Sequence, residues 1–288
     1  MKWLATPNLN PIRHWRIVTV WIGITLIPTA VVSWPLSSWL SAQLDHSIYA
    51  GAWARTMNVT ALRELTVNAA EITPLLQGGG VVALLLTLAF SPFLTGMVIA
   101  SARATQPLKR VALMQSGVRE YGRMLRTLLW SLVPLGIVAA IAALSLSFVD
   151  KRAETAVLES QASREHLLAL ILLVTLFVIA HVTVEAGRAQ FALDMNSRSA
   201  VKAWWRGVRL MFARPVATLA SYVLITAGGL ILVALLGVAR INSPHATLSG
   251  FLLSLALTEL VAVATISMRI ARLLTLIQIA RGEAAGTS

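Results

Sequence analysis

Hydrophobic residues along this chain gather in long uninterrupted blocks, separated by shorter segments that hold most of the charges. Each block has roughly the 20 residues that a helix needs to cross a hydrocarbon core of about 30 Å. The blocks do not alternate between polar and apolar positions as barrel strands do, and a helix satisfies its own backbone hydrogen bonds in lipid. The pattern predicts an all-α integral membrane fold, a single transmembrane domain over residues 1–288. The six predicted transmembrane helices span about 17–34, 80–101, 127–149, 167–187, 216–239 and 249–268.

The longest connection, residues 35–79, is expected to be an outer loop. Leu36, Leu40, Leu44 and Ile48 recur there at every fourth position, which predicts a helix lying on the membrane surface or capping the bundle. Glycines 78–80 are expected to break the chain before the second span. The first span follows basic residues, as a signal peptide would, but its apolar run is too long and lacks a small-x-small cleavage pattern, so we expect it to be retained.

Composition and charge distribution support this interpretation. Hydrophobic residues make up 57% of the chain and charged residues 12%, against about 25% charged in soluble domains. A net charge of +12 would suggest nucleic acid for a soluble protein, but the positive-inside rule explains it here. With the amino terminus inside, the predicted cytoplasmic segments hold 18 of the 24 Lys and Arg residues. We therefore expect both termini in the cytoplasm and no nucleic-acid partner. The absence of cysteine excludes disulfides and thiolate metal sites.

The three pairs of spans share one pattern, in which each even-numbered span ends on a small or apolar residue, then Arg, then another apolar residue. The arginines are Arg103, Arg188 and Arg269, and a basic segment precedes each odd-numbered span. The fold is thus expected to contain three repeated helical hairpins with basic amphipathic cytoplasmic helices. Two interpretations remain open: an internal repeat of the kind found in transporters, or the pattern that any hairpin obeying the positive-inside rule would show.

Polar residues inside the predicted spans are the candidates for chemistry. Glu259 is expected near the bilayer midplane, where a charged carboxylate costs roughly 2.5–3.5 kcal/mol on insertion scales. His181 is its expected partner, since the two differ in depth by about 4–5 Å at 1.5 Å per residue. Glu185 shares the face of His181 one turn on, close to Arg188. These residues predict either a proton, cation or substrate site, or a neutral glutamic acid bonded to a neighbouring helix with an unrelated pair at the interface.

Two basic segments, 107–126 and 199–213, are expected to be interfacial helices. The first has an apolar face of Leu108, Val111, Val118, Tyr121 and Leu125, and the second one of Val201, Trp204, Trp205, Val208 and Met211. This composition predicts contact with anionic lipid headgroups, or with a cytoplasmic ATPase that docks on coupling helices. The candidate contact residues are Lys109, Arg110, Arg119, Arg123, Lys202, Arg206 and Arg209.

The chain contains no Gly-rich phosphate loop, zinc-binding His pair or nucleophile elbow. We expect no enzyme, no cofactor and no metal site. The expected function is that of a non-enzymatic accessory or scaffold subunit, acting through lipid and a partner membrane subunit. The alternative is a permease, either paired with an ATPase or proton-coupled through Glu259 and His181.

Three short segments add a resemblance: Leu-Asp-His-Ser at 44–47, Ser-Pro-Phe-Leu-Thr-Gly at 91–96 and Gly-Arg-Ala at 187–189. With them the chain resembles a group of bacterial six-span inner-membrane proteins over most of its length. The resemblance implies six spans in a bacterial inner (plasma) membrane. It implies no activity and assigns no role to any residue.

Overall fold

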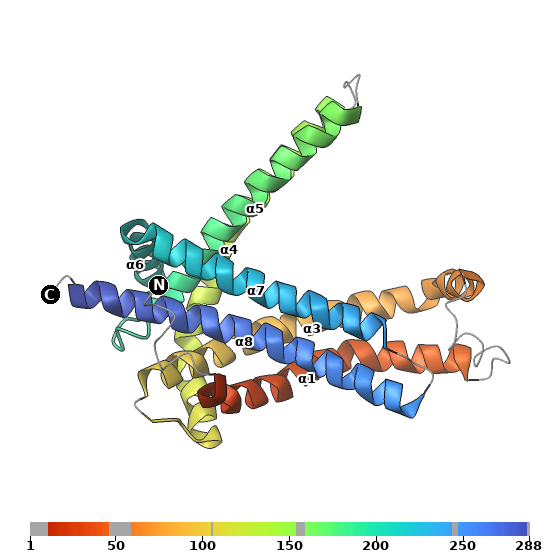
Figure 1. Ribbon diagram of the computed structural model, residues 1–288, viewed down its shortest axis with the longest axis horizontal. Coiled ribbons are helices and arrows are strands. Elements are labelled where there is room, and N and C mark those ends of the chain that lie inside the picture. Colours follow the sequence, from red (N-terminus) through yellow and green to blue (C-terminus); the bar gives the residue numbers. More distant parts are fainter. Residues whose placement is uncertain (1–10, 46–58, 105, 154–158, 244–246, 287–288) are drawn as a thin grey trace. The chain divides into compact units, whose positions relative to one another are not determined.

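The computed structural model describes residues 11–45, 59–104, 106–153, 159–243 and 247–286, and the regular structure in this part of the chain is all α-helix, without a strand (Figure 1). Six of its seven helices are long and apolar enough to cross a membrane, which confirms the predicted fold class and makes the chain a multi-pass membrane protein. The helices are α1 (Pro11–Leu44), α3 (Val59–Arg103), α4 (Arg110–Ala153), α5 (Glu159–Gln190), α6 (Ala200–Ala213), α7 (Pro215–Ile241) and α8 (Leu248–Gly286).

Most of the spanning helices extend well beyond the predicted spans, whereas α7 matches its span closely. Helix α3 has 45 residues and α4 has 44, about twice the length that a hydrocarbon core requires. The predicted break at glycines 78–80 is wrong, because α3 continues through them. Much of the expected outer loop is also helical, since α1 reaches Leu44 and α3 begins at Val59. Ile48, the last residue of the predicted apolar stripe, lies outside the described residues.

The two basic segments behave differently from each other. Segment 107–126 does not form a separate helix, because from Arg110 onward it is the first part of α4 and continues into the span. Segment 199–213 does form one, α6. The Ser199 side chain accepts a hydrogen bond from the backbone N–H of Lys202 and caps its start. The helix ends before Pro215, which begins α7 and cannot continue the backbone hydrogen-bond pattern.

The chain divides into two compact units, and each is described by itself. The first unit comprises Met1–Leu94, Lys109–Val111 and Thr226–Arg269. The second unit comprises Thr95–Leu108, Ala112–Ile225 and Ile270–Ser288. The prediction of a single transmembrane domain is not tested by this division.

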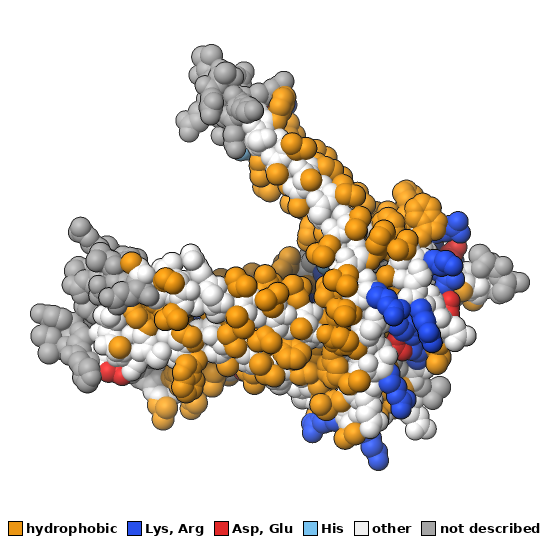
Figure 2. All heavy atoms as spheres, turned by 180° about the vertical axis from the view of Figure 1, so that it is seen from behind, with side chains coloured by type: hydrophobic (Ala, Val, Ile, Leu, Met, Phe, Trp, Pro, Cys, Tyr) orange, Lys and Arg blue, Asp and Glu red, His pale blue; other side chains and the backbone are white. Residues whose placement is uncertain are grey.

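The core of the second unit lies where α5, α6, the first part of α7 and the last part of α8 meet. Val182, Met211 and Tyr222 form one buried cluster there, and a second cluster contains Ala186, Leu210, Ile279 and Ala280. The outer halves of α4 and α5 are instead exposed along their length, as the hydrophobic side chains in Figure 2 show. Leu132 is 67% exposed and Leu144 71%, which is expected of helices that face lipid.

Candidate functional site

A cluster of polar side chains is buried in the second unit, between α5, α7 and α8. Arg272 of α8 donates a hydrogen bond through Nη2 to Oε1 of Glu185 on α5, at 2.9 Å. Its Nη1 lies 3.3 Å from the hydroxyl oxygen of Tyr222 on α7, and its guanidinium lies 4.8 Å from the centre of the Tyr222 ring. The Arg272 and Glu185 side chains are 8% and 9% exposed. An ion pair this deeply buried is costly to form unless its hydrogen bonds are satisfied.

His181 completes this cluster. Its Nδ1 lies 2.9 Å from the Tyr222 hydroxyl oxygen and 3.8 Å from Oε1 of Glu185. The prediction that His181 and Glu185 share one face of a helix is confirmed, because they stand four residues apart on α5. The His181 side chain is 24% exposed, so the cluster opens to its surroundings at one edge. It joins a cation, a carboxylate, an imidazole and a phenol, and the imidazole could bind or release a proton there.

Glu259 belongs to the first unit and His181 to the second, so their pairing stays a prediction. Within the first unit, a cation from α7 binds the residue next to Glu259. Arg240 donates through Nε to the hydroxyl oxygen of Thr258, the residue before Glu259, at 2.7 Å. A Cβ at Gly229 would collide with the side chain of Met268, so these residues of α7 and α8 lie side by side. Both lie about three turns along their helices from the contact between Arg240 and Thr258.

The position of α7 along α8 changes the surroundings expected of Glu259. Arg240 is the last residue but one of α7, whereas about three turns of α8 precede Thr258. Glu259 is therefore level with the cationic end of α7. The predicted fifth span ends at residue 239 and leaves Arg240 outside it. This neighbour of Glu259 was not predicted, because the offset between two helices depends on how they pack.

A second ionic network joins α3, α4 and the segment after α5. Glu120 accepts hydrogen bonds from Arg103 at 2.6 Å and from Arg123 at 2.8 Å. Arg103 also donates to the carbonyl of Phe191, and Arg123 donates to the carbonyls of Asp194 and Ser197 at 2.7 and 3.0 Å. We call Arg103, Glu120 and Arg123 the arginine clamp, because it ties two helices to residues 191–197. The two arginines are 17% and 14% exposed.

The predicted headgroup contacts therefore fall into two groups. Arg123 is engaged in the clamp, Arg206 forms an ion pair with Asp194 at 2.9 Å, and Arg110 lies over the ring of Trp15. The other predicted contacts are exposed and make no ion pair or hydrogen bond through their side chains within the described part of the chain. These are Lys109, Arg119, Lys202 and Arg209.

The Asp194–Arg206 pair sets the charge state of the segment between α5 and α6. The hydrogen bond from Arg206 lowers the pKa of the Asp194 carboxyl below its ordinary value of 3.8, and the backbone N–H groups of Asn196 and Ser197 add to this effect. Asp194 therefore stays ionised to lower pH than a free aspartate. This keeps the positive charge of Arg206 compensated.

Helix α6 presents a different face to the protein from the one predicted. Its buried residues are Ala200, Ala203, Gly207, Leu210 and Met211. Trp204 is half-buried and donates through Nε1 to the hydroxyl oxygen of Thr183 on α5, at 3.1 Å. The predicted apolar face mixed residues from two sides of the helix, because Trp204 and Met211 turn inward while Val201 and Trp205 stay exposed. Small residues were the missed signal, since they permit a close helix crossing.

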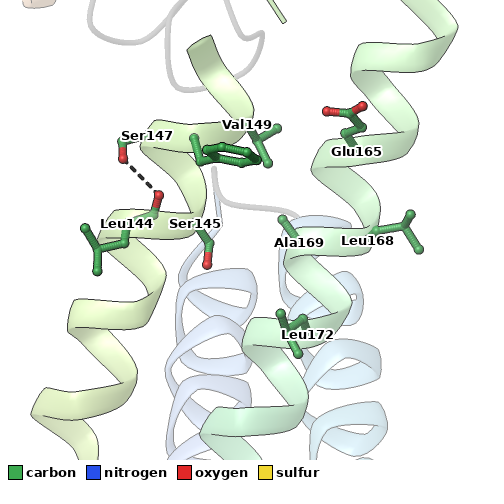
Figure 3. A pocket seen from close by; sticks show the side chains of 9 residues that line it. Leu144, Ser145, Ser147, Val149, Glu165, Leu168, Ala169 and Leu172 are labelled. Carbon is green, nitrogen blue, oxygen red and sulfur yellow. Dashed lines mark hydrogen bonds between the residues drawn. The ribbon is translucent and has the colours of Figure 1, made fainter. Parts of the chain in front are cut away.

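A cleft separates the outer parts of α4 and α5, with a volume of about 860 Å³. Its walls are mostly apolar, and Glu165 of α5 points into it, as does Leu172 (Figure 3). Ser147 of α4 donates to the carbonyl of Leu144 in its own helix, at 2.9 Å. No group of three or more potential metal ligands occurs among the residues that the structure describes. Because its walls are mostly apolar, the cleft offers a surface to apolar chains.

The fold and these sites define a multi-pass membrane protein with buried ionic networks between its helices. Comparisons with protein-family models, curated proteins and solved structures found no match. The resemblance to bacterial six-span inner-membrane proteins therefore stays an expectation.

Proposed function

We propose that this chain is a non-enzymatic accessory or scaffold protein of the bacterial inner membrane, with both termini in the cytoplasm, acting through lipid and partner contacts. The arginine clamp is the observation that carries this proposal. Three charged side chains and the carbonyls they bind fasten the end of α3 and the first part of α4 to residues 191–197. Charge-assisted hydrogen bonds are about twice as strong as neutral ones, which favours a fixed framework.

A second pair of contacts supports the same proposal. Arg214, between α6 and α7, forms an ion pair with Glu283 near the end of α8. Arg281 donates to the carbonyl of Ala102 at the end of α3, at 2.8 Å. Basic residues that would otherwise be free for an external ligand are thus used to join helix ends. A framework of this kind presents a constant surface to a partner.

The test is purification of the tagged chain from native membranes with its surrounding lipid, followed by identification of bound proteins. We expect a partner in constant ratio to the chain, reduced in Glu120→Gln, which breaks the clamp. Glu165→Gln is the matched control, since Glu165 lies in the cleft at the far end of α5 and should leave the partner bound. The proposal fails if the purified chain alone moves a solute across liposomes, or if no partner accompanies it.

The buried cluster of His181, Glu185, Tyr222 and Arg272 favours a second candidate, a proton-coupled permease. An imidazole beside a carboxylate and a cation can change charge within the range of cellular pH, and His181 is open at one edge. The test is a pH jump applied to proteoliposomes on a solid-supported electrode. A permease of this kind gives a current that His181→Gln abolishes and His166→Gln retains. Equal currents with and without protein would exclude it.

A further inference from the structure

Helix α6 has three chemically distinct sides. Residues follow each other at about 100° around a helix, so Val201, Trp205, Val208 and Phe212 fall on a single line. Three of these large side chains are strongly exposed: Val201 is 47%, Trp205 52% and Phe212 74%. We call these four residues the apolar stripe. Lys202, Arg206 and Arg209 lie beside the stripe on a second side, and the buried residues, small ones among them, form the third.

The third side fixes α6 on α5 with no room to rotate. A Cβ at Gly207 would lie 2.8 Å from the backbone of Ala186, and one at Gly187 would lie 2.8 Å from the Cα of Trp204. The two backbones are therefore in direct contact at this crossing, and only glycine permits it. The Trp204 hydrogen bond to Thr183 adds a second fixed point. The direction in which the apolar stripe faces is thus determined by the fold.

The apolar stripe is continuous with a membrane span. Only Arg214 separates the end of α6 at Ala213 from the start of α7 at Pro215. Val216, at the second position of α7, is 79% exposed and lies one turn beyond Phe212. The span that begins there has a mean hydropathy of 2.4, and only 6% of its most apolar stretch is buried within the protein. Helix α6 must therefore lie at the boundary of the bilayer.

From this arrangement we infer that α6 is an interfacial helix that binds anionic phospholipid, with the apolar stripe among the acyl chains and Lys202 and Arg209 at the headgroups. Tryptophan is enriched at membrane interfaces because its ring is apolar and its N–H is polar. Lys202 and Arg209 are exposed and form no ion pair within the described part of the chain, so their charge is available to a phosphate. The inference rests on the proposed membrane function and adds the class of lipid.

The first measurement is spin-label accessibility in proteoliposomes of phosphatidylethanolamine and phosphatidylglycerol. The chain contains no cysteine, so Val201→Cys, Trp205→Cys and Phe212→Cys each provide one labelling site on an exposed position. We expect all three labels to be accessible to oxygen and protected from a water-soluble nickel complex, whereas a label introduced by Lys202→Cys is accessible to the nickel complex. Water exposure at 205 and 212, as a docking site for a soluble protein would show, overturns the inference.

The second measurement tests the charge. A fluorophore at position 205 is quenched by brominated lipids, and the ratio of quenching by brominated phosphatidylglycerol to quenching by brominated phosphatidylethanolamine reports lipid preference. Each basic residue near an anionic surface changes binding by about fivefold, so we expect Lys202→Gln with Arg209→Gln to lower the preference by roughly 25-fold. Arg164→Gln, at the other end of α5, is the control and should leave it unchanged.

An immersed label without preference for phosphatidylglycerol refutes the choice of anionic lipid. These outcomes are separate from the test of the scaffold proposal. A water-exposed α6 would leave the co-purifying partner in place, whereas loss of the partner would leave the label immersed.

Discussion

Breaking the buried ion pair between Glu185 and Arg272 should destabilise the second unit more than losing an ordinary hydrogen bond would. At 2.9 Å two unit charges attract by about 6 kcal/mol at an effective dielectric constant of about 20, and much of that offsets the cost of desolvating both groups. Removing one partner leaves the other charge buried and costs about 3–5 kcal/mol. Single hydrogen bonds between membrane helices average only about 0.6 kcal/mol. The expected loss is therefore several times larger.

The assay is the free energy of unfolding in bicelles, followed by tryptophan fluorescence. Glu185→Leu and Arg272→Met should each lose about 3–5 kcal/mol. The double change Glu185→Leu with Arg272→Met should recover most of the loss, because apolar side chains of similar size need no compensating charge. Arg209→Met, an exposed residue, is the control. Single changes that cost less than about 1 kcal/mol, or a double change that costs the sum of both, would refute the reasoning.

Three further predictions concern other parts of the molecule. Gly207→Ala should destabilise the α5–α6 crossing by about 1–3 kcal/mol or more in unfolding experiments, because the added methyl group meets backbone. The control is Gly122→Ala, where nothing lies within 4 Å, and it should be neutral or stabilising. Equal effects of the two changes would contradict this prediction. The lowered pKa of Asp194 stabilises the fold above pH 3.8, and this contribution is lost as the pH falls below that value. In Asp194→Asn, the free energy of unfolding should therefore no longer show this fall at acid pH. Arg240→Met should cost about 1 kcal/mol of unfolding free energy and Glu259→Gln should recover part of it; strict additivity of the two changes would show that the residues are independent.

The spans could be predicted from the sequence because hydropathy is a local property. Each apolar block carries its own reason for crossing a membrane, whatever the rest of the chain does. The lengths of the helices could not be predicted in the same way. Helix α3 continues through three consecutive glycines, and α4 begins at Arg110, well before its apolar block. Helix ends beyond the lipid are stabilised by packing and ionic contacts, which a local pattern does not contain.

The candidate site was predicted only in part for the same reason. His181 and Glu185 could be placed together because helical spacing relates them within one element. Their partners Tyr222 and Arg272 come from α7 and α8. Arg272 counted toward the positive charge of the carboxyl-terminal segment, yet it stands between Ile270 and a run of leucine and isoleucine. The apolar run that follows Arg272 directly was the one signal that this arginine would be buried.

The basic residues of this chain serve two physical purposes that the positive-inside rule does not separate. Where an arginine points toward neighbouring helices it finds a carboxylate or a carbonyl, as Arg103, Arg123 and Arg272 do, and its charge becomes part of the fold. Where α6 turns Lys202 and Arg209 outward beside exposed apolar residues, no such partner exists in the described chain. The first group resists salt because it is shielded from solvent, whereas the second is screened within about 10 Å at 0.1 M ionic strength. Raising the salt concentration should therefore release anionic lipid from α6 while leaving the arginine clamp and the unfolding free energy nearly unchanged.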